Sequence, residues 1–154
     1  MRTAFRPVLA ILLLVGATTA VDAQKPEFGT PAEAKAMLER TVVAMKADKA
    51  KTIERINKGD GAFKDRDLYP ACSDLNGKVT AHPDKTRIGM DRNTMKDAAG
   101  KPYGGEIMKA AKEGAINEVS YLFPRPGQDK TPVQKVAYVT RVGDQVCLVG
   151  YYKP

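Results

Sequence analysis

The sequence predicts an α+β domain in which an antiparallel sheet packs against a long N-terminal helix. Three observations carry this prediction: a helical apolar pattern after residue 30, two hairpin signals far apart in the chain, and a run of strand-like segments at the C-terminal end. The predicted order is helix, helix, two strands, short helix, three strands. This order is typical of α+β domains rather than of alternating α/β domains.

Residues 1–23 have the pattern of a secretion signal. Arg2 and Arg6 give a basic start, residues 7–20 are apolar, and small residues around Ala23 suit signal peptidase cleavage. A membrane helix needs about 20 apolar residues, so an uncleaved anchor is the less favoured alternative. No second apolar run of that length follows. We therefore expect a free periplasmic or secreted protein, with no stable membrane insertion after cleavage.

The rest of the chain is long enough for one domain, and we expect a linker at residues 24–29 and a single domain at residues 30–154. The formal net charge of the whole sequence is +7, which permits attraction to anionic ligands, although a solvated basic surface is the simpler interpretation. Basic residues alternate with acidic ones, tryptophan is absent, and no arginine-rich block is interleaved with aromatic residues. Nucleic acid is therefore not an expected partner.

The first helix is predicted to begin at Thr30, which can cap it, with Pro31 in the first turn and Glu33 completing a capping box. Its apolar stripe is formed by Ala34, Met37, Leu38, Thr41, Val42 and Met45. A second, shorter helix is predicted over residues 49–57.

Residues 67–83, DLYPACSDLNGKVTAHP, predict a β-hairpin. Its strands are Leu68–Ser73 and a return strand that ends at His82-Pro83, with the turn at Asn76-Gly77. Asn-Gly favours a type I′ turn because both central residues of that turn need a positive φ.

Downstream of the hairpin, residues 83–101 are rich in charge, Gly and Pro, and predict a loop with at most one helical turn. A short helix and three strands follow, which brings the sheet to five strands. These elements are the helix Tyr103–Glu113, closed by Gly114, and the strands Ala115–Phe123, Val133–Val142 and Gln145–Tyr152, with a turn at Gly143-Asp144 between the last two.

Lys135 is the strongest candidate for a binding residue. Strand alternation places it on one face with Val133 and Ala137, and an ammonium on such an apolar face must reach solvent or find an anion. The same alternation places Tyr121 beside Phe123, where its hydroxyl can orient a carboxylate. Two alternatives stay open: Lys135 reaching solvent at a sheet edge, and Tyr121 filling the core.

His82 is the only histidine, and no Ser or Cys nucleophile motif accompanies it. We therefore expect no catalytic residue, no metal site and no cofactor, and the chain is not expected to be an enzyme. Tyr69 and Tyr138 are weaker candidates, since tyrosines in strands mostly fill cores. Tyr138 should point away from Lys135 unless a bulge intervenes. Arg87 can close over an anion, although a solvated loop arginine is the simpler interpretation.

The only two cysteines, Cys72 and Cys147, both fall within predicted strands. An even number of cysteines in an exported chain favours a disulfide. The alternative is a pair of buried free thiols that act as small hydrophobic side chains.

Several segments together resemble the single Cache domain family, in its second single-Cache type. The hairpin at residues 67–83 resembles the central hairpin of that family, and the resemblance covers nearly all of residues 28–152. The other matching segments are Phe28-Gly29-Thr30, Gly100-Lys101-Pro102-Tyr103, Tyr121 to Pro126, Lys135 to Val139, Arg141 to Asp144 and Gly150-Tyr151-Tyr152.

The sequence also departs from the family pattern. Pro70 to Ser73 replaces a more aromatic strand, and Phe123 stands where tryptophan is usual. Ile116 replaces another aromatic residue, and Leu148 and Val149 stand where small residues are common. These departures bear on the ligand more than on the fold.

The resemblance implies a PAS-like sheet behind the long helix, with the first and last strands adjacent. It thereby implies a cross-strand bridge between Cys72 and Cys147. It also implies that Lys135 meets a ligand carboxylate and that His82 lies beside the pocket. The expected function is the binding or sensing of a small organic anion such as a short-chain carboxylate, with signalling through a separate membrane sensor or transporter. The alternative is a structural or protein-interaction domain whose pocket is filled by bulky side chains such as Phe123.

Overall fold

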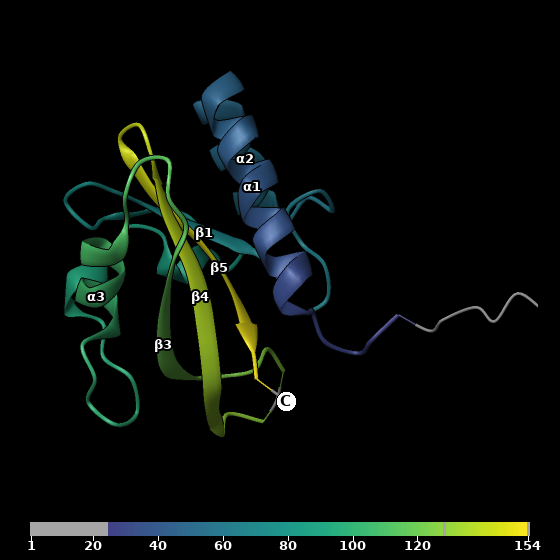
Figure 1. The fold of residues 1–154 in the computed structure, drawn as a ribbon, viewed down its shortest axis with the longest axis vertical. Helices are drawn as coiled ribbons and strands as arrows, with labels where there is room; N and C mark the ends of the chain where they lie inside the picture. Colours follow the sequence, from purple (N-terminus) through teal and green to yellow (C-terminus); the bar gives the residue numbers. More distant parts are fainter. Residues whose placement is uncertain (1–24, 128, 154) are drawn as a thin grey trace, which may run out of the picture.

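A five-stranded antiparallel sheet forms the centre of the molecule in the computed structural model, which describes residues 25–127 and 129–153. Helices α1 (Pro31–Ala47) and α2 (Lys49–Lys58) cover one face of the sheet, and α3 (Tyr103–Ala110) covers the other (Figure 1). The predicted secretion signal, residues 1–23, lies outside the described residues. Within the described ranges, no helix has the length and apolar character needed to cross a membrane.

The strands are arranged in the order β2-β1-β5-β4-β3, and every neighbouring pair is antiparallel. Their bounds are β1 (Pro70–Asp74), β2 (Val79–Ala81), β3 (Asn117–Pro124), β4 (Pro132–Val142) and β5 (Gln145–Tyr152). The first and last strands are therefore neighbours. The predicted α+β architecture, with five antiparallel strands against a long N-terminal helix, is confirmed.

Helix α1 begins with the predicted capping box. The backbone N–H of Glu33 donates to Thr30 Oγ1 at 3.3 Å, and the backbone N–H of Thr30 donates to Glu33 Oε2 at 2.8 Å. The apolar stripe packs on the sheet and is buried, apart from Val42, which is half-buried. Asp48 caps α2 by accepting a hydrogen bond from the backbone of Lys51.

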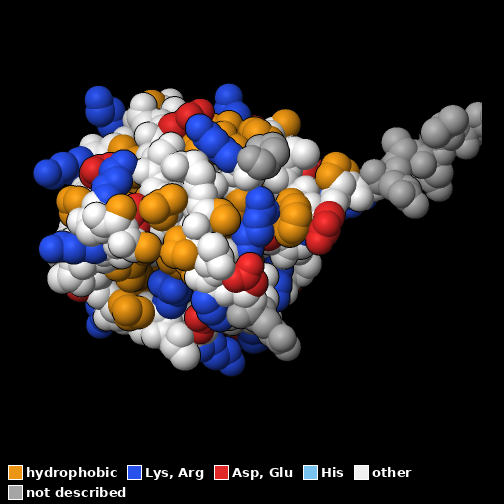
Figure 2. Space-filling view, turned by 90° about the horizontal axis from the view of Figure 1, so that it is seen from below, with side chains coloured by type: hydrophobic (Ala, Val, Ile, Leu, Met, Phe, Trp, Pro, Cys, Tyr) orange, Lys and Arg blue, Asp and Glu red, His pale blue; other side chains and the backbone are white. Residues whose placement is uncertain are grey.

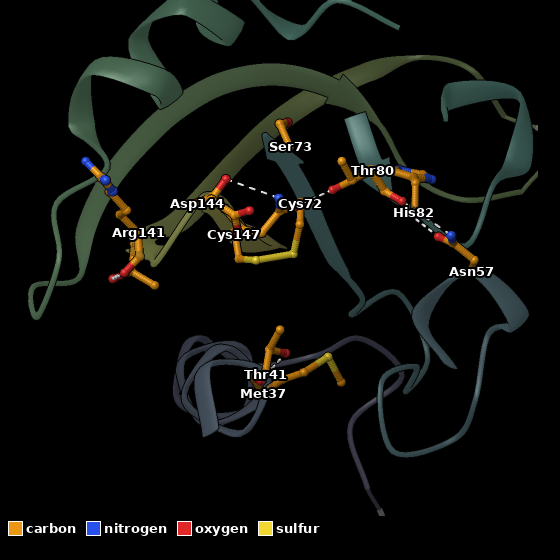
Figure 3. The surroundings of a disulfide bond; sticks show 12 residues. Met37, Thr41, Asn57, Cys72, Ser73, Thr80, His82, Arg141, Asp144 and Cys147 are labelled. Carbon is orange, nitrogen blue, oxygen red and sulfur yellow. Dashed lines mark hydrogen bonds between the residues drawn. A yellow bond between two sulfur atoms is a disulfide. The ribbon is translucent and has the colours of Figure 1, made fainter. Parts of the chain in front are cut away.

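Cys72 and Cys147 form a disulfide that links β1 to β5. They lie directly opposite each other in the antiparallel register, and both are fully buried on the α1 face, close to Met37 and Thr41 (Figure 3). The predicted bridge is confirmed, and the alternative of two free thiols is wrong.

The turn of the β1–β2 hairpin is not of type I′, so that prediction is wrong. The backbone N–H of Gly77 donates to Asp74 O at 3.0 Å, which places Leu75 and Asn76 at the centre of the turn. Only Gly77 has a positive φ here, at 95°. The carboxylate of Asp74 accepts the backbone N–H groups of Asn76 and Lys78, and this local capping favours an ordinary turn followed by a left-handed glycine.

Helix α3 ends at Ala110, three residues earlier than the predicted end at Glu113. Lys112 O instead accepts the backbone N–H of Arg141 in β4 at 3.2 Å, which draws this segment out of the helix and onto the sheet. Gly114 therefore belongs to a separate turn rather than to the helix end, and β3 begins at Asn117.

The loop between β2 and α3 contains two 3₁₀ turns, η1 (Lys85–Arg87) and η2 (Arg92–Thr94), where at most one helical turn was predicted. Backbone hydrogen bonds tie this loop to the hairpin: Arg92 N donates to Gly77 O at 2.8 Å, and Val79 N donates to Met90 O at 2.9 Å. The loop is thereby held beside β1 and β2 and forms part of the site described below.

Lys and Arg side chains are spread over the molecular face in Figure 2, with Asp and Glu side chains between them. Basic and acidic residues are likewise interspersed along the sequence. Nothing on this face has the form of a continuous basic stripe of the kind that binds nucleic acid.

Candidate functional site

The site lies on the sheet face that α3 covers, opposite the disulfide. Lys135 on β4 is paired in register with Tyr121 on β3 and with Tyr152 on β5. Gly150 leaves room for the lysine stem, because a Cβ atom at Gly150 would overlap Lys135 Cε. The predicted shared face of Lys135 and Tyr121 is therefore confirmed by the strand register.

A cavity of about 30 Å³ opens beside Lys135, and we call it the inner cavity. Its polar lining consists of Tyr69, His82, Arg87, Arg92, Tyr103, Tyr121 and Lys135. Its other lining residues are Ala71, Val79, Met95, Phe123, Leu148 and Gly150. Neither Asp nor Glu is among these residues. Since one water molecule needs roughly 10–15 Å³ of cavity, the space suits a small polar group.

Lys135 is only 3% exposed and lies among aromatic rings. Its Nζ donates to Tyr152 Oη at 3.3 Å and to Tyr69 Oη at 3.5 Å, and it lies 5.2 Å from the centre of the Phe123 ring. Burial lowers the pKa of Lys135 to about 7, although the nearby Asp67 carboxylate opposes this shift. The ammonium is thus close to losing its proton at neutral pH unless an anion joins it.

Arg92, on η2, is a second buried cation and is 4% exposed. Its Nε donates to Ser73 Oγ, while its two terminal nitrogens make no hydrogen bond to the described residues. Burial lowers the pKa of Arg92, but a guanidinium stays charged at neutral pH. Sequence reasoning missed this residue, because only the hydrogen bonds that tie the loop to the hairpin bring it to the cavity.

His82 and Tyr69 form the rim of the inner cavity, with their rings 5.1 Å apart and edge to face. The backbone N–H of His82 donates to Asn57 Oδ1 at 2.9 Å (Figure 3), and its Nδ1 accepts the backbone N–H of Asp84. Burial, followed by the charge of Arg87, lowers the pKa of His82 to about 4. Its imidazole is therefore neutral at neutral pH.

Aromatic residues form one wall of the inner cavity. The Tyr121 ring stacks on that of Tyr103 at 4.2 Å, and Phe123 meets the Tyr121 ring edge to face at 6.0 Å. Burial raises the pKa of Tyr121, so its hydroxyl keeps its proton and can act as a donor. Tyr121 therefore serves the core and also lines the cavity.

Four of the five residues predicted for binding come together around the inner cavity: Lys135, Tyr121, His82 and Tyr69. Tyr138 does not. It lies on the opposite face and packs against Tyr151 in the core beneath α1, with a ring distance of 5.6 Å. Its orientation away from Lys135 follows from regular strand alternation, since the β3–β4 and β4–β5 registers continue without a shift at this point.

A wider cleft of about 280 Å³ lies outside the rim, and we call it the outer cleft. It is lined by Lys64, Arg66, Tyr69, His82, Pro83, Asp84, Arg87 and Pro126. Tyr69, His82 and Arg87 line both spaces and therefore form the partition between them.

The lining of the inner cavity could compensate a negative charge. Lys135 and Arg92 bring two buried positive groups without an acidic residue in the lining, and isolated buried charges are costly unless they are compensated. Among the described residues, no group of three or more His, Cys, Asp or Glu is placed to hold a metal ion.

Solved structures similar to this chain include chemotaxis proteins and a chemosensory domain. One is described as "Periplasmic sensor domain of chemotaxis protein"; it is 22% identical, with a TM-score of 0.58, and the match covers 79% of this chain and 88% of that one. Another, a methyl-accepting chemotaxis protein from Vibrio parahaemolyticus, is 21% identical, with a TM-score of 0.63 and coverage of 79% and 86%.

A third similar structure is described as "Structural basis for carboxylic acid recognition by a Cache chemosensory domain". It is 22% identical, with a TM-score of 0.58 and coverage of 79% and 86%. At these identities the three structures establish a shared fold. The family model described as "Single Cache domain 2" matches residues 29–150, which is most of the chain, and the protein therefore belongs to the single Cache domain family.

Proposed function

We propose that this protein is an extracytoplasmic binding domain for a small organic anion, with a short-chain carboxylate as the expected ligand. The observation that carries the proposal is the pair of buried cations, Lys135 and Arg92, at a cavity whose lining contains no acidic residue. A carboxylate between them would form charge-assisted hydrogen bonds with both, which are stronger than hydrogen bonds between neutral groups. The Tyr121 hydroxyl is a further donor to such a ligand.

The size of the cavity supports a short ligand. About 30 Å³ accommodates a carboxylate with a very short tail, and the walls formed by Phe123 and Leu148 exclude a longer one while Arg87 stays in place. One structural neighbour is described by its recognition of a carboxylic acid, which agrees with this ligand class.

The proposed role is binding and sensing rather than catalysis. His82 is neutral and lies at the rim, and its ring nitrogen Nδ1 is occupied by the backbone of Asp84. No cofactor is part of the proposal. A separate membrane sensor or transporter would receive the signal. Two of the similar structures are described as belonging to chemotaxis proteins, which supports a sensing role.

A filled pocket is the second candidate, in which the domain serves a structural or protein-interaction role. The small volume of the inner cavity favours it, because Phe123 and Leu148 occupy much of the space beside Lys135. This candidate predicts that no small acid stabilises the protein. Arg92 speaks against it, since an apolar filling leaves this buried guanidinium charged and without an acidic partner in the cavity lining.

A thermal-shift screen of small carboxylates, followed by calorimetry, tests the proposal. A ligand at about a hundred times its dissociation constant stabilises the folded state by roughly 2.7 kcal/mol. Lys135→Met keeps much of the apolar stem but removes the charge, so affinity should fall by about 1.5–3 kcal/mol.

Lys109→Met is the matched control, because Lys109 is exposed on α3 and does not line the inner cavity. It should bind like the unmodified protein. Equal affinities for all three proteins would remove Lys135 from the site, and the absence of any stabilising acid would favour the filled pocket.

A further inference from the structure

Arg87 is the charged member of the partition between the inner cavity and the outer cleft. It lines both spaces from the 3₁₀ turn η1, and its side chain is 31% exposed. The other two members of the partition are more firmly held. His82 is hydrogen-bonded through its backbone and its ring, and Tyr69 packs against it and accepts from Lys135.

Three side chains contact Arg87 in its inward position: the Tyr103 hydroxyl, the Phe123 ring and the Asp84 carboxylate. Its guanidinium carbon lies 5.0 Å from the centre of the Phe123 ring, a cation–π contact. Its Nε lies 3.8 Å from Asp84 Oδ2, in an ion pair whose acidic partner is 52% exposed. An ion pair with an exposed partner is weak and a single cation–π contact is modest, so outward rotation of the side chain breaks no strong interaction.

We propose that Arg87 is a gate between the outer cleft and the inner cavity, and that its closed position restricts the ligand to acids of two or three carbons. This inference rests on the proposed binding of a carboxylate in the inner cavity. Closed, the gate leaves about 30 Å³ for the ligand. Open, it connects that space to the roughly 280 Å³ of the outer cleft, which can hold a longer tail.

The two arginines that line the outer cleft, Arg66 and Arg87, differ in how well their charges are compensated. Arg66 in the outer cleft is already compensated, because its Nη2 lies 2.6 Å from Glu33 and 2.8 Å from Asp65. The one acidic partner of Arg87 among the described residues is Asp84, and that contact is longer, at 3.8 Å. A ligand carboxylate in the inner cavity offers Arg87 a better partner in a drier place, so binding draws the gate closed over the ligand.

Removal of the Arg87 side chain should relax the length limit. We would compare acetate, propionate, butyrate and hexanoate by calorimetry on the unmodified protein, Arg87→Ala and Arg87→Gln. In the unmodified protein, affinity should fall beyond three carbons. In both variants acetate should bind more weakly, while longer acids should gain roughly fourfold per methylene that enters the outer cleft.

Lys85→Ala is the control, because Lys85 lies on the same turn and carries the same charge, but it is exposed and lines neither space. It should keep the chain-length profile of the unmodified protein. An unchanged profile in both Arg87 variants, measured where the unmodified protein binds acetate, would refute the gate alone. Failure of the unmodified protein to bind any of the acids would refute the carboxylate site and the gate with it.

Discussion

Lys135 is buried with its ammonium group surrounded by aromatic rings, and its charge depends on what else enters the cavity. Burial lowers its pKa to about 7, and the positive charge of Arg87 acts in the same direction, while Asp67 opposes the shift. A bound anion would favour the charged form and raise this pKa. Binding of a carboxylate should therefore be accompanied by uptake of a proton above neutral pH.

Carboxylate affinity should decrease as the pH rises from about 7 to 9, because the empty site then has to take up a proton in order to bind. Calorimetry in buffers of different ionisation enthalpy measures this proton uptake directly. Lys135→Met should bind weakly at every pH in this range, without proton uptake. Affinity that is independent of pH in the unmodified protein would contradict the assigned role of Lys135.

The stability of the ligand-free protein should rise with pH, whereas carboxylate affinity should fall. The folded pKa of Lys135 lies below the unfolded value of 10.5, so between about 7 and 10.5 the unfolded chain binds a proton that the folded chain lacks. Unfolding free energy should therefore rise with pH across this window, and the rise should be absent in Lys135→Met.

The disulfide links the neighbouring strands β1 and β5 on the face away from the inner cavity. It joins residues 75 positions apart in the sequence, so it closes a long loop in the unfolded chain. The bridge therefore supports the sheet from the face opposite the inner cavity.

The double variant Cys72→Ala/Cys147→Ala should lose about 2–5 kcal/mol of unfolding free energy, because the unfolded chain is no longer constrained. Urea denaturation measures the loss, and reduction of the unmodified protein should lower stability similarly. Carboxylate affinity should be unaffected while the variant is folded, since the bridge and the cavity lie on opposite faces. Stability that is insensitive to reduction would contradict this view.

At the scale of the whole molecule, Arg125 joins the segment before α1 to the end of β5. Its guanidinium lies between the rings of Phe28 and Tyr152, at 4.0 and 4.8 Å, and its Nη1 lies 3.6 Å from Asp67 Oδ2. Tyr152 in turn accepts a hydrogen bond from Lys135. Only Lys135 therefore lies between this contact of Arg125 with Tyr152 and the proposed ligand.

The mature protein should begin at Gln24 if residues 1–23 act as a secretion signal. Mass spectrometry of periplasmic material should find this N-terminus, because the apolar run is shorter than a comfortable membrane span. Recovery of the intact chain in the membrane fraction would instead favour an anchored sensor.

The features that could be predicted from the sequence alone depend on residues close together in the chain. The capping box at Thr30 spans three residues, and strand alternation has a period of two, so the start of α1 and the shared face of Lys135 and Tyr121 could be read directly. The same alternation placed Tyr138 on the other face. The five strands and the proposal of an anion site around Lys135 follow from such short-range rules together with the family resemblance.

The features that could not be predicted from the sequence depend on contacts between segments far apart in the chain. Arg92 reaches the cavity through the backbone pairing of its loop with Gly77, and α3 ends early because Lys112 bonds to Arg141 in β4. The volume of the inner cavity and the position of the Arg87 gate depend on side chains from several elements packed together. No local pattern encodes these features, because each arises only when segments far apart in the sequence compete for the same hydrogen bonds and the same space.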